Sequence, residues 1–267
     1  MLDDTALSFE LLRTLNSAKV QGTQVQGNGP VLTLRRIISL IGVNGVRLAS
    51  NTLRPWPGPL SATHAALLQV TLDRARLAGH TAQALRPKGY DAQVVYLIAV
   101  LQNLGRLMLR YHFADEAEQI AQLMRPAMSA TEPPTEQPGL SEEAASYAVL
   151  GVDIESLSSA VGRHWGLGDD VMHMVRRLAP DAPVRKPDHD ADVLRITASA
   201  ANEAVDALHE TTPARVVAGI QHVAQRYGRA LGVGPRDIQD ALKAARERLR
   251  RGSSPEEPVE RDGVAAE

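Results

Sequence analysis

Apolar residues recur at intervals of three and four along almost the whole chain. This spacing, which places them on one face of an α-helix, restricts the fold more than any other feature of the sequence. The strongest such stretch follows Asp91, a residue suited to cap a helix start, and its apolar stripe implies burial in the middle of a bundle. No segment is convincing as a β-strand, and no internal repeat is present. The pattern therefore predicts an all-α protein, a multi-helix bundle with no substantial sheet.

Glycine, proline and capping residues mark the helix boundaries in the first half of the chain. Gly42 is expected to end one helix, and Asn44 is placed to cap the next. Residues 62–85 are predicted to form one long helix rich in alanine and leucine. The helix capped by Asp91 is expected to carry its apolar stripe as far as Met108.

Composition changes indicate how the chain is divided. The segment between Met128 and Pro138 is poor in apolar residues and contains three prolines, which is typical of an exposed linker. We therefore expect an N-terminal helical part (1–124), a linker (125–140) and a C-terminal helical part (141–250). Proline, glutamate, serine and glycine dominate the end of the chain, so residues 251–267 are expected to be a disordered tail.

Several classes of protein are excluded by composition. The chain has no cysteine, which excludes disulfides, zinc–thiolate sites and cysteine nucleophiles. Its formal net charge of -2 gives no reason to expect bulk capture of nucleic acid or of an anionic membrane. Residues 1–10 lack the features of a signal peptide, and no apolar stretch approaches the roughly 20 residues that cross a bilayer. A cytoplasmic protein without membrane association is the resulting expectation.

Familiar catalytic motifs are missing from the sequence. It contains no Walker-type phosphate loop, no GxGxxG and no GxSxG. None of the eight histidines forms an HxxxH or HExxH pair, and His64 and His80 are too far apart on one helix to share a metal directly. The basic pair Arg176 and Arg177 is interpreted as a solvated face.

Four segments, in order along the chain, carry a family resemblance. Residues 11–18 read LLRTLNSA, residues 34–48 read LRRIISLIGVNGVRL, residues 96–109 read YLIAVLQNLGRLML, and residues 150–167 begin LGVDI and end WGL. Together they resemble the HDOD domain family, a branch of the HD-domain proteins, over about residues 3–178. This resemblance implies a helical HD-type bundle.

The resemblance also implies that the metal site of the HD hydrolases has been dismantled. Those enzymes hold metal ions with a distant histidine, a His-Asp dyad and a further acid. Here the dyad positions correspond to Gln102 and Asn103, the upstream histidine position falls near Asp73, and the histidine of the later GVDH stretch is Ile154. Neutral amides are poor ligands for a transition metal. We therefore expect a vestigial pocket at these four residues, no metal, no cofactor and no enzymatic activity.

By this resemblance the chain is expected to be a regulatory interaction module in bacterial signal transduction. It would bind a signalling protein or sense a small ligand near Gln102, Asn103 and Asp73. In some relatives such a domain follows a protein-kinase or receiver domain, and family members usually have further helices before the LLRLxNSA stretch. The chain is therefore also interpreted as a possible fragment of a larger signalling protein.

Other interpretations remain open. The two amides can simply satisfy each other and nearby backbone groups. The chain can be a divergent HD-type metal-dependent phosphohydrolase whose ligands lie elsewhere. A nucleic-acid-binding role through Arg35 and Arg36, or through residues 246–251, is disfavoured by Glu247 and the acidic tail.

The N-terminal helix offers a candidate interface. Leu7, Leu11 and Leu15 recur at helical spacing, with Phe9 and Leu12 beside them. If nothing covers this stripe, it forms an apolar patch of the kind that marks protein interfaces. A second copy of the chain, a fused upstream domain or a separate signalling partner would then cover it. The alternative is that the helix packs into the bundle by this face.

Overall fold

Helices make up nearly all of the regular structure in the computed structural model, which describes residues 5–20, 34–53, 55, 58–128, 136–210 and 212–252. The all-α prediction is confirmed for this part of the chain. The first six helices are α1 (Thr5–Val20), α2 (Leu34–Thr52), α3 (Ala62–Leu85), α4 (Ala92–Leu101), α5 (Leu104–His112) and α6 (Ala114–Leu123). After a short hairpin come α7 (Glu142–Leu150), α8 (Ile154–His164), α9 (Asp169–Val175), α10 (Asp190–Ala207), α11 (Pro213–Leu231) and α12 (Pro235–Gly252).

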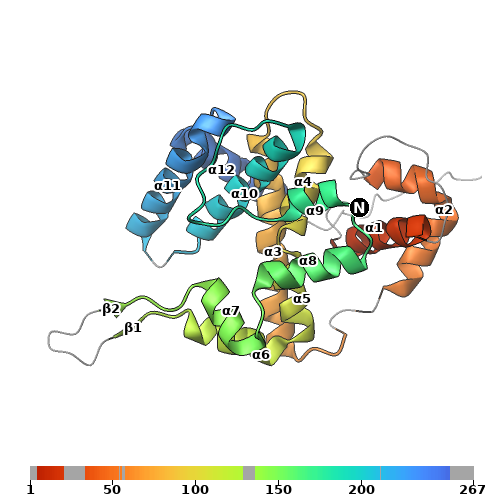
Figure 1. Cartoon of the computed structure of the whole chain (residues 1–267), viewed down its shortest axis with the longest axis horizontal. Coiled ribbons are helices and arrows are strands. Elements are labelled where there is room, and N and C mark those ends of the chain that lie inside the picture. The colour runs from red at the N-terminus through yellow and green to blue at the C-terminus, as the bar shows by residue number, and fades with distance from the viewer. Residues whose placement is uncertain are drawn as a thin grey trace, which may run out of the picture.

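The long helix α3 lies at the centre of the main core and packs against α4, α5, α10 and α12 (Figure 1). Its buried face consists largely of small residues, including Ala75, Ala78, Gly79 and Ala82. Small side chains allow helix axes to approach closely. At Gly79 a Cβ would come within 2.6 Å of the Tyr96 ring on α4, so only glycine fits this contact.

The smaller core lies between α5, α6, α7 and α8 and is formed by buried apolar side chains: Leu109, Ala117, Ile120, Ala145 and Ile154. The helices α6 and α7 pack together, and the chain between them leaves the body as a two-stranded antiparallel hairpin, β1 (Ala127–Met128) and β2 (Glu136–Gln137) (Figure 1). The segment predicted as a linker at 125–140 is therefore an excursion between two packed helices. It does not divide the core, because α3 on one side of it packs against α10 and α12 on the other.

Several predicted boundaries are confirmed. The predicted long helix at 62–85 coincides with α3, and α2 is kinked at Gly42, where the backbone has φ 64°. The Asp91 carboxylate accepts the backbone N–H groups of Gln93 (2.7 Å) and Val94 (3.2 Å). The prediction of one continuous helix through Met108 is wrong, because α4 ends at Leu101 and α5 sets off at 45°.

In the described ranges, no helix taken singly has the length and hydropathy needed to cross a membrane; the bent pair α4–α5 meets those criteria only jointly.

The N-terminal helix packs into the molecule by its apolar face. Leu11 and Leu12 are fully buried, and the Phe9 ring lies 5.7 Å from the ring of Trp165, just after α8. The expectation of an uncovered patch is therefore wrong for Leu11. The side chains of Leu15, Arg35 and Arg36 lie outside the described residues. The predicted tail at 251–267 starts too early, because α12 continues to Gly252, and the rest of it lies outside the described residues.

Candidate functional site

The bend between α4 and α5 is produced by side-chain amides that replace backbone hydrogen bonds. Asn103 donates its backbone N–H to the carbonyl of Val100 (2.9 Å) instead of to that of Ala99, one turn back. The Ala99 carbonyl accepts instead the side-chain amides of Asn103 (3.0 Å) and of Asn202 on α10 (3.1 Å). A polar side chain that competes for a helix carbonyl ends or bends the helix. The two residues at the dyad positions therefore lie at the break itself.

Gln102 is buried and bonded at both ends of its amide. Its Nε2 donates to the carbonyl of Met174 (3.1 Å), to Ser199 Oγ (3.3 Å) and to the carbonyl of Arg195 (3.4 Å). Its Oε1 accepts from Asn202 Nδ2 (3.1 Å). The side chain therefore joins α4 to the end of α9 and to α10, which is a structural use of the amide.

Asn103 and Asn202 complete this polar cluster. Asn103 Nδ2 donates to Asn202 Oδ1 (2.8 Å), and Asn202 Nδ2 also donates to the carbonyl of Ala198 (3.1 Å). Both residues are buried. The interpretation in which these amides satisfy one another and the neighbouring backbone agrees with this geometry.

Arg177 lies at the centre of the cluster, and the sequence interpretation missed it. Its guanidinium donates to Asn103 Oδ1, to Asn202 Oδ1 (2.9 Å), to the Gln102 carbonyl (3.3 Å) and to Asp206 Oδ2 (2.9 Å). The side chain is only 11% exposed, so its interpretation as part of a solvated face is wrong, whereas Arg176 is exposed. Burial lowers the pKa of Arg177, and the positive charge of Arg106 lowers it further.

A ring of further charges surrounds the arginine. Arg106 on α5 makes a two-pronged ion pair with Glu142 on α7, with Nε–Oε1 at 2.7 Å. Burial raises the pKa of Glu155 on α8, although Arg106 and Arg177 oppose the shift. An ion pair therefore joins α5 to α7, and both arginines lie close enough to Glu155 on α8 to influence its pKa.

The other two predicted site residues do not join the cluster. Asp73 on α3 has a side chain 55% exposed, and its partners are Gln69 (3.0 Å) and Arg76 (3.7 Å) on the same helix. Its assignment to the pocket is wrong, because counting along the sequence placed it on the wrong face of α3. Ile154 is buried in the smaller core and contacts α5 near Gly105. It is a packing residue beside the cluster.

The side chains at this place do not fit a metal ion. Gln102 and Asn103 contribute amides whose oxygens already accept protein N–H groups, and a guanidinium lies where a cation would have to bind. Like charges repel strongly in a desolvated space. Elsewhere in the described part of the chain, no group of three or more His, Asp or Glu side chains is arranged to hold a metal.

The raised pKa of Glu155 gives a prediction of pH dependence. An acid whose pKa is raised on folding stabilises the protein when the pH is below the pKa of the unfolded chain, which is 4.5 for Glu155. This contribution is lost as the pH rises through the pKa of the folded protein. Glu155→Gln, which mimics the protonated acid, is expected to raise the free energy of unfolding at pH 7 by less than ~1 kcal/mol. Urea denaturation at pH 7 and pH 4 measures the difference in free energy of unfolding between the variant and the unsubstituted protein. The gain in stability should disappear at pH 4. A variant that is less stable at pH 7 would contradict the prediction.

Comparisons with known proteins agree with this architecture. An HDOD domain model matches residues 1–179. The MmoQ response regulator from Methylococcus capsulatus is similar in structure over 91% of this chain and 86% of its own, with 17% identity and a TM-score of 0.60. A virulence factor from Campylobacter jejuni is similar over 91% of this chain and 81% of its own, with 16% identity and a TM-score of 0.54. No curated protein matches the chain. The family match covers more than half of the residues, and the chain belongs to the HDOD domain family.

Proposed function

We propose that this protein is a non-catalytic regulatory module of bacterial signal transduction, which acts in the cytoplasm by binding a signalling protein. One observation carries the proposal: the Arg177 guanidinium is hydrogen-bonded to the side chain or backbone of both residues at the dyad positions. A permanent cation is thereby fixed where the HD hydrolases need metal ions. The likeness to a protein described as a response regulator supports a role in signalling.

Phosphoester hydrolysis requires groups that stabilise charge on the phosphoryl oxygens. Arg177 is the cation best placed in the cluster, but its donors are directed to Asn103, Asn202, Asp206 and the Gln102 backbone. The arrangement therefore supports a structural role for the guanidinium over a catalytic one.

The same geometry favours a protein partner over a small ligand. Ligand sensing at Gln102 and Asn103 would require their amides to exchange buried internal hydrogen bonds for ligand contacts. Breaking such bonds leaves other buried groups unpaired, at a cost of about 1–3 kcal/mol each. Contact through the outer helix surfaces has no such cost.

A combined metal and activity assay tests the proposal. Protein purified without chelator is expected to contain no stoichiometric Mn, Fe, Ni or Zn. With Mg²⁺ or Mn²⁺ added, it is expected to hydrolyse no nucleotide, cyclic dinucleotide or simple phosphoester. Turnover that requires the added metal and is abolished by EDTA would establish the phosphohydrolase alternative instead.

A further inference from the structure

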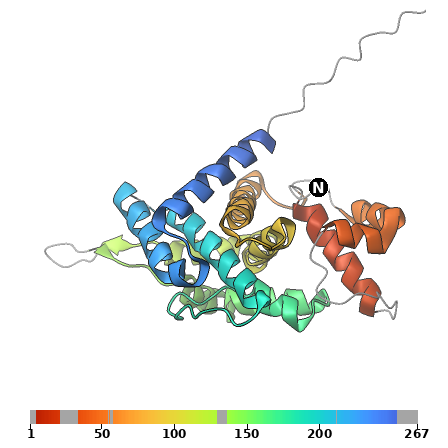
Figure 2. The same ribbon diagram turned by 90° about the horizontal axis from the view of Figure 1, so that it is seen from above.

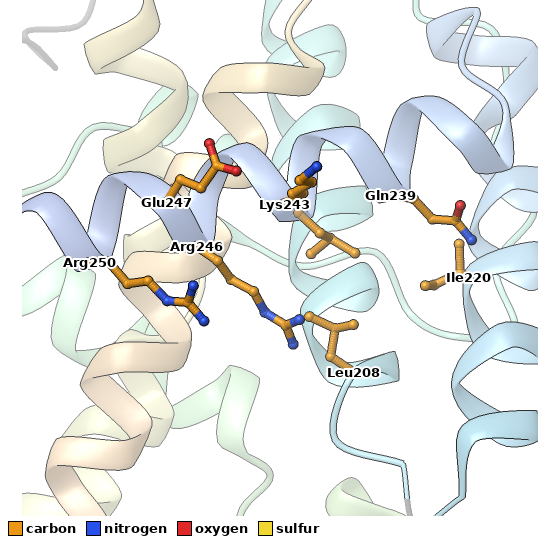
Figure 3. Close-up of a pocket in the computed structure, with 8 residues that line it drawn as sticks. Leu208, Ile220, Gln239, Lys243, Arg246, Glu247 and Arg250 are labelled. Carbon is orange, nitrogen blue, oxygen red and sulfur yellow. The ribbon is translucent and has the colours of Figure 1, made fainter.

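A groove lies between α12, the end of α10 and α11, away from the amide cluster (Figure 3). Its volume is about 340 Å³, and it is lined by Leu208, Ile220, Gln239, Leu242, Lys243, Arg246, Glu247 and Arg250. That volume is at the small end of the range of ligand pockets, roughly 300–1,000 Å³. The groove therefore suits a few side chains of a bound segment.

The floor of the groove is apolar. Ile220 and Leu242 are almost fully buried beneath it, and Leu208 is half-buried at its side. An apolar floor at the surface is stabilised when another apolar side chain covers it. An occupant that covers the exposed part of Leu208 with an apolar side chain would therefore bind more tightly than one that does not.

One wall of the groove is basic. Figure 3 shows Arg246 and Arg250 extending from α12 on the side of Leu208, whereas Glu247 extends on the opposite side and does not lie between them. Arg246 makes no hydrogen bond or ion pair with any residue that the structure describes. The wall can therefore bind carboxylates without breaking an existing pair at Arg246.

The wider surface of α12 has the same character. Residues 243–251 contain five basic side chains and one acid. Figure 2 places this helix at the outer edge of the molecule, with its C-terminal end pointing away from the body. A partner can therefore approach the groove without displacing a helix.

We propose that this groove binds an acidic, amphipathic segment of a partner protein, with carboxylates on Arg246 and Arg250 and an apolar side chain on the floor. The proposal rests on the partner-binding function above and names its surface. A peptide matches both features of the groove, whereas a nucleic-acid backbone would match the charge and leave the apolar floor uncovered. The net charge of -2 for the whole chain also favours a local contact over bulk capture of nucleic acid.

Fluorescence anisotropy on the full chain tests the proposal. The probe is a labelled dodecapeptide of glutamate and leucine at helical spacing. Arg246→Glu is expected to weaken its binding about tenfold, because the substitution removes an attraction and adds a repulsion. The matched control is Arg236→Glu, which lies in the first turn of the same helix, is exposed and does not line the groove. It makes the same charge change and is expected to alter binding less than about twofold. Circular dichroism should show both variants folded.

Other outcomes would overturn the proposed peptide binding in the groove. Equal weakening in both variants would mean general electrostatic attraction, and equal binding of a peptide with serine in place of leucine would exclude the apolar floor. Tighter binding of a single-stranded oligodeoxynucleotide of the same length would assign the surface to nucleic acid. If the unsubstituted chain self-associates and the Arg246→Glu variant does not, the groove would be assigned to a second copy of the chain. The two proposals fail separately: metal-dependent turnover contradicts the proposed function only, and absence of peptide binding contradicts the groove only.

Discussion

Arg177→Ala is expected to lower the free energy of unfolding by about 2–6 kcal/mol, because it leaves two buried oxygens without a donor and each such group costs about 1–3 kcal/mol. The substitution leaves Asn103 Oδ1 and the Gln102 carbonyl without the guanidinium donor. It also removes one of the two donors to Asn202 Oδ1 and the ion pair with Asp206. The Asp206 side chain is half exposed and can be rehydrated, so most of the loss comes from the amide and carbonyl oxygens.

Urea denaturation followed by circular dichroism measures this loss. Arg176→Ala is the matched control, because the neighbouring arginine is exposed, and it is expected to change stability by less than ~0.5 kcal/mol. If the two variants were equally stable, the guanidinium would not be holding the amide cluster together.

Gly105→Val is expected to destabilise the protein by about 3 kcal/mol, through a different cause. A Cβ at Gly105 would lie 2.4 Å from the backbone oxygen of Ile154 and 2.9 Å from its Cγ2. A side chain can rotate away from such a contact, but a backbone carbonyl cannot, so α5 and α8 would have to separate. Overpacking of this kind costs about 1–3 kcal/mol, and rigid contacts lie at the upper end.

Gly168→Val provides the comparison. No atom lies within 4 Å of a Cβ at Gly168, and its φ of -68° suits any residue. Only the loss of a favoured capping residue is expected, at less than ~1 kcal/mol. Thermal unfolding of the two variants separates the effects; similar melting temperatures would show that α5 and α8 are less closely packed than described.

Much of the helical architecture could be predicted because its signals are local. Asp91 and Asp153 cap helices through their own side chains, as does Thr212, and Gly42 kinks α2 through its own backbone. Each cap depends on residues only two or three positions away, and the kink depends on Gly42 itself. The resemblance over residues 3–178, which short contiguous motifs suggested, was confirmed by the HDOD match to residues 1–179.

The remainder depends on contacts between residues distant in the sequence. The apolar stripe continues across Gln102, so the periodicity gave no sign that Asn202, a hundred residues later, would take the helix carbonyl there. Arg177 was misinterpreted for the same reason, since its partners Asn103 and Asn202 belong to other elements. Asp73 was misplaced because a spacing along the sequence does not determine which face of α3 a residue occupies.

The central position of α3 has a consequence for synthesis of the protein. Its core partners include α10 and α12, so a helix at residues 62–85 is covered by helices that begin only at residues 190 and 235 and leave the ribosome well after it. The HDOD match ends at residue 179, before either of these helices begins. A nascent chain that has emerged only that far exposes the inner faces of α3 and α4 to solvent and to other apolar surfaces. The main core therefore closes only after α10 and α12 have been made, and slow translation of residues 180–252 prolongs a state prone to aggregation.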